Sequence, residues 1–229
     1  MKTISRVGGM AVLMAVGAGP LSAATPGRGA GQWRVEPQVV IGLGLKSHEV
    51  GVTTDGQSVK ISAGGGVGAG ISLGYGLTES TDFEVLWGYQ RSTLSPDVTN
   101  ASGSFDRYLT LATVKYKIPL VKKEDSWLDF KIGGGVGQYP SGKFKTDFGS
   151  VGAGRSEVRY KAGQGFHLTA DFERYLRRWS LSAGVRYSVV SYQAKSFEFN
   201  GSAQPVSNLK PEFEKFKGDG IDFVLALKF

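Results

Sequence analysis

The chain has no cysteine and only two histidines, and none of its apolar runs is long enough to cross a bilayer as a helix. Without cysteine there can be no disulfide framework, no Cys-ligated zinc and no thiol catalysis. Two histidines, His48 and His167, do not supply a multi-histidine metal site. We therefore expect neither a metal nor another cofactor.

The composition is that of a folded chain and not of a disordered one. Of 229 residues, 41% are hydrophobic and 21% are charged, a mixture too apolar for disorder and too even for a helical membrane protein. The formal net charge is +7. Lysine and arginine are spread among acidic residues and do not form a basic patch, so we expect no nucleic-acid partner.

The first residues have the pattern of an export signal. Two positive charges within residues 1–6 precede an uncharged stretch over 7–19, and Pro20–Ala24 follows with small residues where a signal peptidase needs them. This order is typical of a cleaved secretory signal peptide, with cleavage after Ala23 or Ala24. An uncleaved anchor helix is the alternative. We predict a signal peptide over 1–24, a short periplasmic leader over 25–33 and one domain over 34–229.

Beyond the leader, apolar and polar residues alternate with a period of two. This pattern predicts β-strands with one apolar face. Eight such segments lie near 34–46, 60–76, 82–92, 105–118, 127–139, 158–174, 179–192 and 219–229. In 60–76 an apolar face that includes Ile61, Ala63 and Val67 opposes a face of glycine and serine. In 158–174, Tyr160 and Phe166 are expected on the same apolar face.

Three features favour a transmembrane barrel over a soluble sandwich or lipocalin-like barrel. Connections alternate in length, as in transmembrane barrels: 77–81, 119–126 and 175–178 are short, whereas 47–59, 93–104, 140–157 and 193–218 are long. Aromatic residues gather at strand ends, with Tyr108 and Tyr160 among those expected near the long loops. The polar face combines glycine with charges of both signs, which suits an enclosed lumen.

The last strand, Gly220–Phe229, resembles the C-terminal strand of bacterial outer-membrane barrels. Those strands alternate apolar residues and end in an aromatic residue that the barrel-insertion machinery recognises. Here the residues that match this insertion signal are Phe223, Leu225, Leu227 and Phe229.

Together with the eight segments, the chain resembles the small OmpA/OmpX-type, porin-like outer-membrane barrels without a periplasmic domain. The resemblance implies an all-β, eight-stranded antiparallel transmembrane barrel with up-and-down order. It also implies an integral protein of the bacterial outer membrane with both termini in the periplasm. Its expected partners are outer-membrane lipid and lipopolysaccharide, the insertion machinery, and an extracellular ligand at the long loops.

An eight-stranded barrel has an interior about wide enough for side chains. Buried charges must pair, so the polar face predicts a lumen filled by a network of charged residues. The expected members are Glu36, Glu84, Arg107, Lys115, Lys117, Asp129, Lys131, His167, Asp171, Glu173 and Arg186. A narrow polar conduit along the same side chains is the alternative.

His167, Thr169, Asp171 and Glu173 share one strand face, and a base beside a hydroxyl and carboxylates can serve hydrolysis. Lipid A deacylases among outer-membrane barrels use a His-x-Ser pair, but here threonine replaces the serine. The alternation also points these residues into the lumen, away from lipid. We therefore expect no enzyme, and we expect His48, in the first long loop, to be solvated.

The sequence thus favours an outer-membrane barrel with a structural or surface-binding role and a largely filled polar lumen. A narrow pore for ions or small solutes is the first alternative, and a lipid A-modifying enzyme is the second. The ligand, the loop partners and the oligomeric state stay open. The strand number would be ten if segment 140–157 or 193–218 contained a hairpin.

Overall fold

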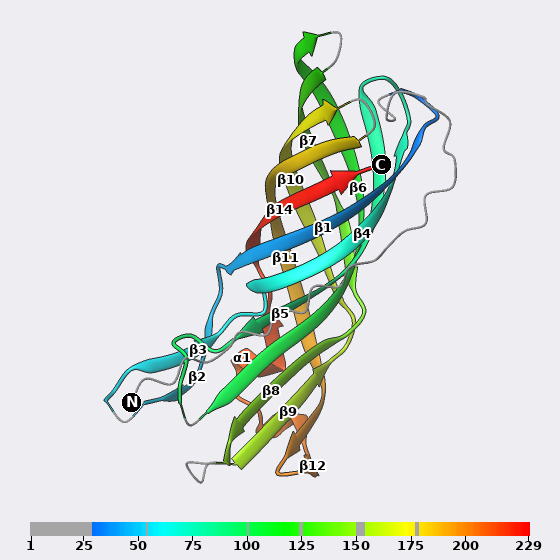
Figure 1. Cartoon of the computed structure of the whole chain (residues 1–229). Coiled ribbons are helices and arrows are strands. Elements are labelled where there is room, and N and C mark those ends of the chain that lie inside the picture. The colour runs from blue at the N-terminus through cyan, green and yellow to red at the C-terminus, as the bar shows by residue number, and fades with distance from the viewer. Residues whose placement is uncertain (1–28, 54, 100, 124–125, 150–153, 177–178) are drawn as a thin grey trace.

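The alternating segments form one antiparallel sheet that closes on itself (Figure 1). The computed structural model describes residues 29–53, 55–99, 101–123, 126–149, 154–176 and 179–229. The ring consists, in order, of β1 (Trp33–Gly44), β4 (Gly66–Gly76), β5 (Thr81–Thr93), β6 (Ser102–Lys123), β7 (Ser126–Tyr139), β10 (Gly163–Leu176), β11 (Trp179–Phe199) and β14 (Gly220–Lys228). Each strand pairs with its predecessor, and β14 pairs with β1. This confirms the predicted eight-stranded up-and-down barrel. The predicted signal peptide over 1–24 lies outside the described residues.

The strands place apolar side chains outside and polar side chains inside. In β1, for example, Val35, Val39 and Ile41 are exposed, whereas Arg34 and Glu36 are buried. Large apolar side chains exposed in water on this scale would be costly. The outer surface is therefore suited to lipid and the interior to polar contacts.

The C-terminus closes the barrel at the end where the connections are short. The backbone amide of Phe229 donates to the carbonyl of Val35 at 3.1 Å, and the reverse bond measures 3.2 Å. Figure 1 shows β8, β9 and β12 at the opposite end from the C-terminus.

Segment 140–157, expected as a loop, continues the barrel wall. It forms β8 (Gly142–Phe148) and the start of β9 (Gly154–Tyr160), which pair with each other. β8 also pairs with β6, and β9 with β11, so they prolong β7 and β10. The ring keeps eight strands but is longer on this side. Strands β6 and β7 likewise extend into the predicted turn at 119–126.

The predicted strand 60–76 is wrong in its first part. Residues Ser58–Ile61 form β3, which pairs with β2 (His48–Val52) in a separate hairpin. The barrel strand begins only at Gly66, whose φ of +99° is possible because glycine lacks a side chain. This break reverses the alternation, so Ile61 and Ala63 are buried whereas Val67 is exposed.

The predicted strand 158–174 is also interrupted, and its face assignment for Tyr160 is wrong. β9 ends at Tyr160 and β10 begins at Gly163, opposite a matching interruption between Tyr139 and Gly142. Lys161 and Ala162 are both exposed, so the alternation shifts by one residue: Tyr160 points inward while Phe166 stays exposed. A one-residue change of register moves every later side chain to the other face.

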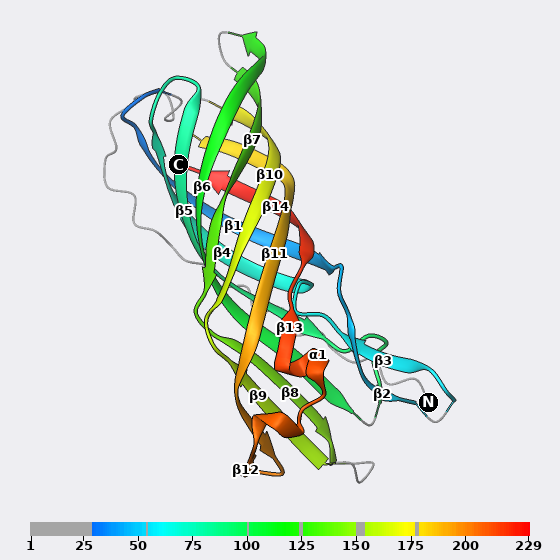
Figure 2. The same cartoon turned by 180° about the vertical axis from the view of Figure 1, so that it is seen from behind.

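The last long connection folds back over the barrel mouth. A turn at Asn200 and Gly201, with φ of 49° and 78°, leads into β12 (Ser202–Gln204). The 3-10 turn η2 (Val206–Asn208), α1 (Pro211–Glu214) and β13 (Lys215–Lys217) follow, and β13 pairs with β11 (Figure 2). No helix among the described residues is long and apolar enough to span a membrane.

Candidate functional site

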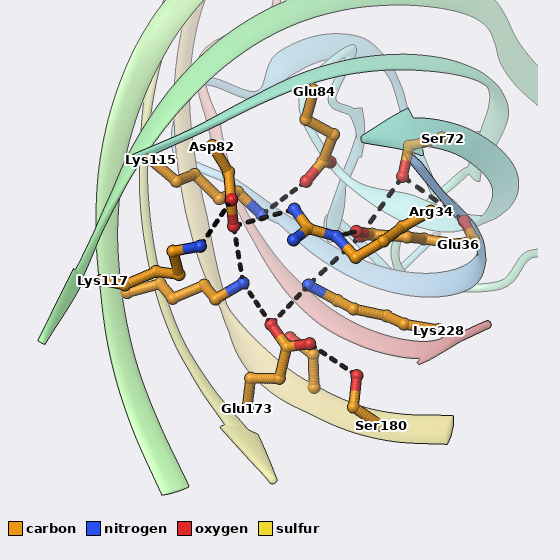
Figure 3. Close-up of polar contacts among 12 residues, drawn as sticks. Arg34, Glu36, Ser72, Asp82, Glu84, Lys115, Lys117, Glu173, Ser180 and Lys228 are labelled. Atoms are coloured by element: carbon orange, nitrogen blue, oxygen red, sulfur yellow. Dashed lines mark hydrogen bonds and ion pairs between the residues drawn. The ribbon is translucent and has the colours of Figure 1, made fainter. Parts of the chain in front are cut away.

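The half of the lumen nearer the short turns holds a cluster that we call the charge layer. Its members are Arg34, Glu36, Asp82, Glu84, Lys115, Lys117, Lys131, Asp171, Glu173 and Lys228, and all are buried. Figure 3 shows how most of them point toward one another. They come from six strands around the ring, β1, β5, β6, β7, β10 and β14. Inward-facing positions alternate with the exposed apolar ones, so strand geometry alone directs these side chains to one space.

Asp82 joins three cations in this layer. Its carboxylate lies 2.8 Å from Arg34 Nη2, 2.8 Å from Lys117 Nζ and 2.9 Å from Lys131 Nζ. These contacts connect β1, β5, β6 and β7 across the lumen (Figure 3).

The remaining ion pairs complete the crossing. Lys228 Nζ lies 3.0 Å from Glu173 Oε2 and 3.2 Å from Glu36 Oε2, and Lys131 also contacts Glu173. Lys115 Nζ lies 2.9 Å from Glu84 and 3.2 Å from Asp171. Each charge has an opposite partner, which buried charges require. The charge layer therefore fills the section of the lumen with mutually neutralised side chains.

A second polar layer, which we call the arginine clasp, lies farther toward the long loops. It comprises Gln90, Arg107, Arg186 and Asp222. Arg186 Nη2 lies 2.8 Å from Asp222, and Gln90 donates to the same carboxylate at 2.9 Å. Arg107 Nε donates to Gln90 Oε1 at 3.0 Å.

Arg107 also holds two loop segments against the wall. Its guanidinium donates to the carbonyl of Gly218 at 3.4 Å and to that of Gly64 at 3.5 Å. Gly64 lies shortly before β4 and Gly218 shortly before β14, so one buried arginine links the long connections that lead into these two strands to β6.

Between the two layers lies a cavity of about 30 Å³. It is lined by Glu36, Lys115, Thr169, Asp171 and Arg186, among others. This volume is enough for about two water molecules. The Thr169 hydroxyl has no hydrogen-bond partner among the described residues, so water is its natural partner. The cavity is far too small to be an open channel.

The outer half of the lumen is apolar, which corrects the expectation of a largely filled polar lumen. Phe213 of α1 and Phe216 of β13 insert into it, and we call this pair the aromatic plug. The Phe216 ring lies 5.2 Å from that of Phe105 and 5.5 Å from that of Tyr160, centroid to centroid. Phe213 stacks on Phe144 at 5.4 Å. Leu109 and Leu111 belong to the same core, at inward positions where the sequence pattern was expected to be polar.

The structure distributes the predicted lumen residues over these layers. Glu36, Glu84, Lys115, Lys117, Lys131, Asp171 and Glu173 are in the charge layer, Arg107 and Arg186 are in the arginine clasp, and Asp129 is fully buried on β7. The predicted lumen set lacks Arg34, Asp82, Asp222 and Lys228, which are all buried. Arg34 and Asp82 have the same parity as Glu36 and Glu84 on β1 and β5. Asp222 and Lys228 lie opposite the exposed apolar positions of β14, a strand without a predicted member, so the alternation could have identified all four.

His167 is buried in the lumen, where its Nε2 lies 2.8 Å from Thr113 Oγ1. No hydrogen bond joins it to Thr169, whose hydroxyl is unpaired among the described residues. The histidine, threonine and carboxylates that suggested hydrolysis thus share a strand face without forming a catalytic pair. Within the described residues, no group of three or more potential ligands could hold a metal ion.

His48 is not solvated as expected. Its ring lies 4.4 Å from that of Phe216 and 5.9 Å from that of Phe213, so β2 packs against the aromatic plug. Burial lowers the pKa of His48 below its ordinary value of 6.5, although Glu212 and a backbone hydrogen bond to Lys217 act in the other direction.

No protein-family model matches the chain, and no curated protein matches it in sequence. Solved structures do match in fold. The outer-membrane protein OprG from Pseudomonas aeruginosa has a TM-score of 0.51 at 14% identity, over 88% of this chain and 98% of that one.

Two further matches are more distant. The outer-membrane protein AlkL has a TM-score of 0.48 at 13% identity, covering 93% of this chain and 95% of that one. The N-terminal β-barrel domain of OprF from Pseudomonas aeruginosa has a TM-score of 0.40 at 13% identity, covering 87% and 98%. With its closed ring of eight strands and its apolar outer surface, the chain is a small β-barrel of the outer-membrane type.

Proposed function

We propose that this protein is an integral outer-membrane barrel with a closed lumen, and that its role is structural or surface-binding. The observation that supports a closed lumen most directly is that two independent layers of side chains fill it. The charge layer crosses one half, and the aromatic plug with its surrounding core fills the other half. A barrel that is blocked twice is suited to stabilise the envelope or to present its outer end, and not to pass solutes.

The outer end supports a presenting role. Strands β8 and β9 carry the wall beyond the ends of β1 and β4, and the connections around β2 and α1 pack onto its inner side. Rigid loops on a scaffold are the usual place for recognition. In this proposal the long connections face the exterior, both termini face the periplasm, and the strand ending at Phe229 is read by the insertion machinery.

Labelling on intact cells tests the location and orientation. The natural chain lacks cysteine, so single cysteines can be placed without background. Ser207→Cys lies in an exposed outer turn, and Thr78→Cys lies in an exposed short turn at the other end. A membrane-impermeant maleimide should label the first on intact cells and the second only after the outer membrane is opened. The opposite pattern, or labelling of neither site after lysis, would refute the proposal.

Solute release tests the closed lumen. Vesicles loaded with a small sugar and carrying the folded protein should retain their contents as well as protein-free vesicles do. A general porin in matched vesicles provides the positive control. Rapid release through the natural chain would favour the narrow-pore alternative.

A further inference from the structure

The outward face of the barrel carries a row of charged residues just beyond the apolar surface. Arg91 of β5 lies opposite Asp106 of β6 on the neighbouring strand. The same cross-strand row continues with Lys143 of β8 and then with Arg159 of β9. We call these four residues, three cations and one carboxylate, the cationic row. Their side chains point away from the lumen, because Gln90, Arg107 and Phe144 occupy the alternate, buried positions.

The row lies at the level expected for lipid headgroups. Two residues nearer the short turns, Tyr89 and Tyr108 form a cross-strand aromatic pair on the same face, with ring centroids 5.2 Å apart. Two residues of strand correspond to about 7 Å along the chain. Aromatic girdles mark the edges of the apolar band of transmembrane barrels, so the next outward row meets the phosphate layer.

The cations are only partly neutralised by the protein. Asp106 accepts from the Tyr89 hydroxyl and lies 3.6 Å from Arg91 Nε. The carboxylate of Glu157 is shared, lying 2.8 Å from both Lys143 Nζ and Arg159 Nε and 3.9 Å from Lys145 Nζ.

Glu157 counts as one negative charge beside these cations, because its pKa is lowered. Burial raises its pKa, but the hydrogen bonds from Lys143 and Arg159 outweigh that effect and lower it. Arg91 and Arg159 remain more than half exposed, at 56% and 57%. Three cations in the row thus share two carboxylates and keep free donors.

A hollow of about 710 Å³ lies beside the row and is lined by Arg91 of the row and by Glu157, the ion-pair partner of Lys143 and Arg159. Arg91, Ser104, Lys145, Arg155 and Glu157 are among its lining residues. The lining offers hydroxyls, cations and carboxylates, which together suit the hydroxyls of a sugar. On the other side of Arg91 the same cross-strand row continues as Val67 of β4 and Ile41 of β1, both apolar and exposed.

We propose that the cationic row and this hollow bind a phosphorylated glycolipid of the outer leaflet. The phosphate oxygens accept hydrogen bonds from Arg91, Lys143 and Arg159, and the sugar occupies the hollow. Charge-assisted bonds from guanidinium groups to phosphate are among the strongest that side chains make. The inference rests on the proposed membrane location, since it places the lipid by depth.

Binding in detergent micelles tests the site separately from the cellular location. The full folded chain is titrated with bisphosphorylated lipid A and with the same lipid after removal of both phosphates. We expect the phosphorylated lipid to bind at least about tenfold more tightly. The triple variant Arg91→Gln, Lys143→Gln, Arg159→Gln should lose about that factor.

The matched control removes three other exposed outer cations, Lys210→Gln, Lys215→Gln and Lys217→Gln, and should bind within about twofold of the natural chain. The heat-dependent gel shift of folded barrels confirms folding of each variant. Equal binding of both lipids, an unchanged triple variant, or an equal loss in the control would overturn the proposal. Full displacement by millimolar inorganic phosphate would also overturn it, because the site would then serve a free anion. Failure here leaves the cell-labelling result intact, so the two hypotheses are distinguishable.

Discussion

At the scale of residues, Glu173 connects two cations in the charge layer. It is fully buried and contacts Lys131, Lys228 and the Ser180 hydroxyl. Glu173→Gln keeps the shape but removes the charge, so two buried lysines lose a shared partner. Removing one member of a buried ion pair typically costs about 3–5 kcal/mol.

We expect a loss of that size in urea unfolding of the barrel in lipid vesicles. The exposed Glu212→Gln should change the free energy of unfolding by less than about 0.5 kcal/mol. A loss no larger for Glu173→Gln than for this control would mean that the charge layer does not stabilise the folded barrel.

His48 gives the outer end a pH dependence. Burial against the aromatic plug lowers its pKa below 6.5, so the folded state favours the neutral ring. This contribution is fully present above the unfolded pKa and is lost as pH falls through the lower folded value. Acidification below about 6.5 should therefore loosen the β2–β3 hairpin.

Amide hydrogen exchange of β2 and β3 at pH 7.5 and 5.5 measures this effect. Exchange at the lower pH, corrected for its intrinsic rate, should be faster in the natural chain and unchanged by pH in His48→Gln. If the corrected exchange rates of the natural chain and of His48→Gln were equal at both pH values, the pH dependence would not come from His48.

At the scale of elements, the crossing of Ser62–Gly65 into the lumen requires close backbone contact. A Cβ on Gly64 would lie 2.0 Å from the carbonyl oxygen of Asp219, a distance that no side chain tolerates. Gly64→Ala should therefore displace this segment from Arg107 and destabilise the outer end by at least about 1–3 kcal/mol, the usual cost of overpacking.

Gly51→Ala is the matched control, because its Cβ would meet only Phe148 at 3.8 Å, an ordinary contact. Protease cleavage within 47–65 should increase in Gly64→Ala and stay at the natural level in Gly51→Ala. Equal resistance of both variants would show that the segment does not depend on this contact.

The elements also show where sequence reasoning succeeded. Alternation predicted the β1, β5 and β14 positions well, because an uninterrupted strand keeps one parity from end to end. It failed at Gly66 and at Lys161–Ala162, where the strand is interrupted and the side chains before the interruption point to the face opposite to the one expected. Such breaks depend on contacts with other strands, so the misassigned face of Tyr160 could not be corrected from its own segment.

Inside the lumen, the polar character of the charge layer was predictable because charged residues occupy inward positions on several strands. The apolar outer half was not, because Phe213 and Phe216 belong to a connection without strand periodicity. Which loop residues fold back into a barrel is decided by tertiary contacts such as those of Arg107.

At the scale of the whole molecule, assembly depends on the final strand. Phe229→Ala keeps the two backbone bonds to Val35 but removes the exposed terminal ring. If the ring is recognised during insertion, the variant should accumulate less in the outer membrane, several-fold by immunoblotting of membrane fractions. Phe229→Trp should assemble normally.

Refolding of purified Phe229→Ala into vesicles provides the control, since spontaneous refolding needs no recognition. It should match that of the natural chain. Normal accumulation of Phe229→Ala in cells would refute the assignment of an insertion signal, whereas poor refolding would assign the ring a structural role.

The closed lumen is the central claim for the molecule as a whole, and single-channel recording in a planar bilayer tests it most directly. The folded natural chain should show no discrete openings under conditions in which a general porin conducts. Phe213→Ala with Phe216→Ala should also stay silent, because the charge layer still crosses the other half of the lumen. Reproducible openings of the natural chain would contradict the account and identify the barrel as a pore.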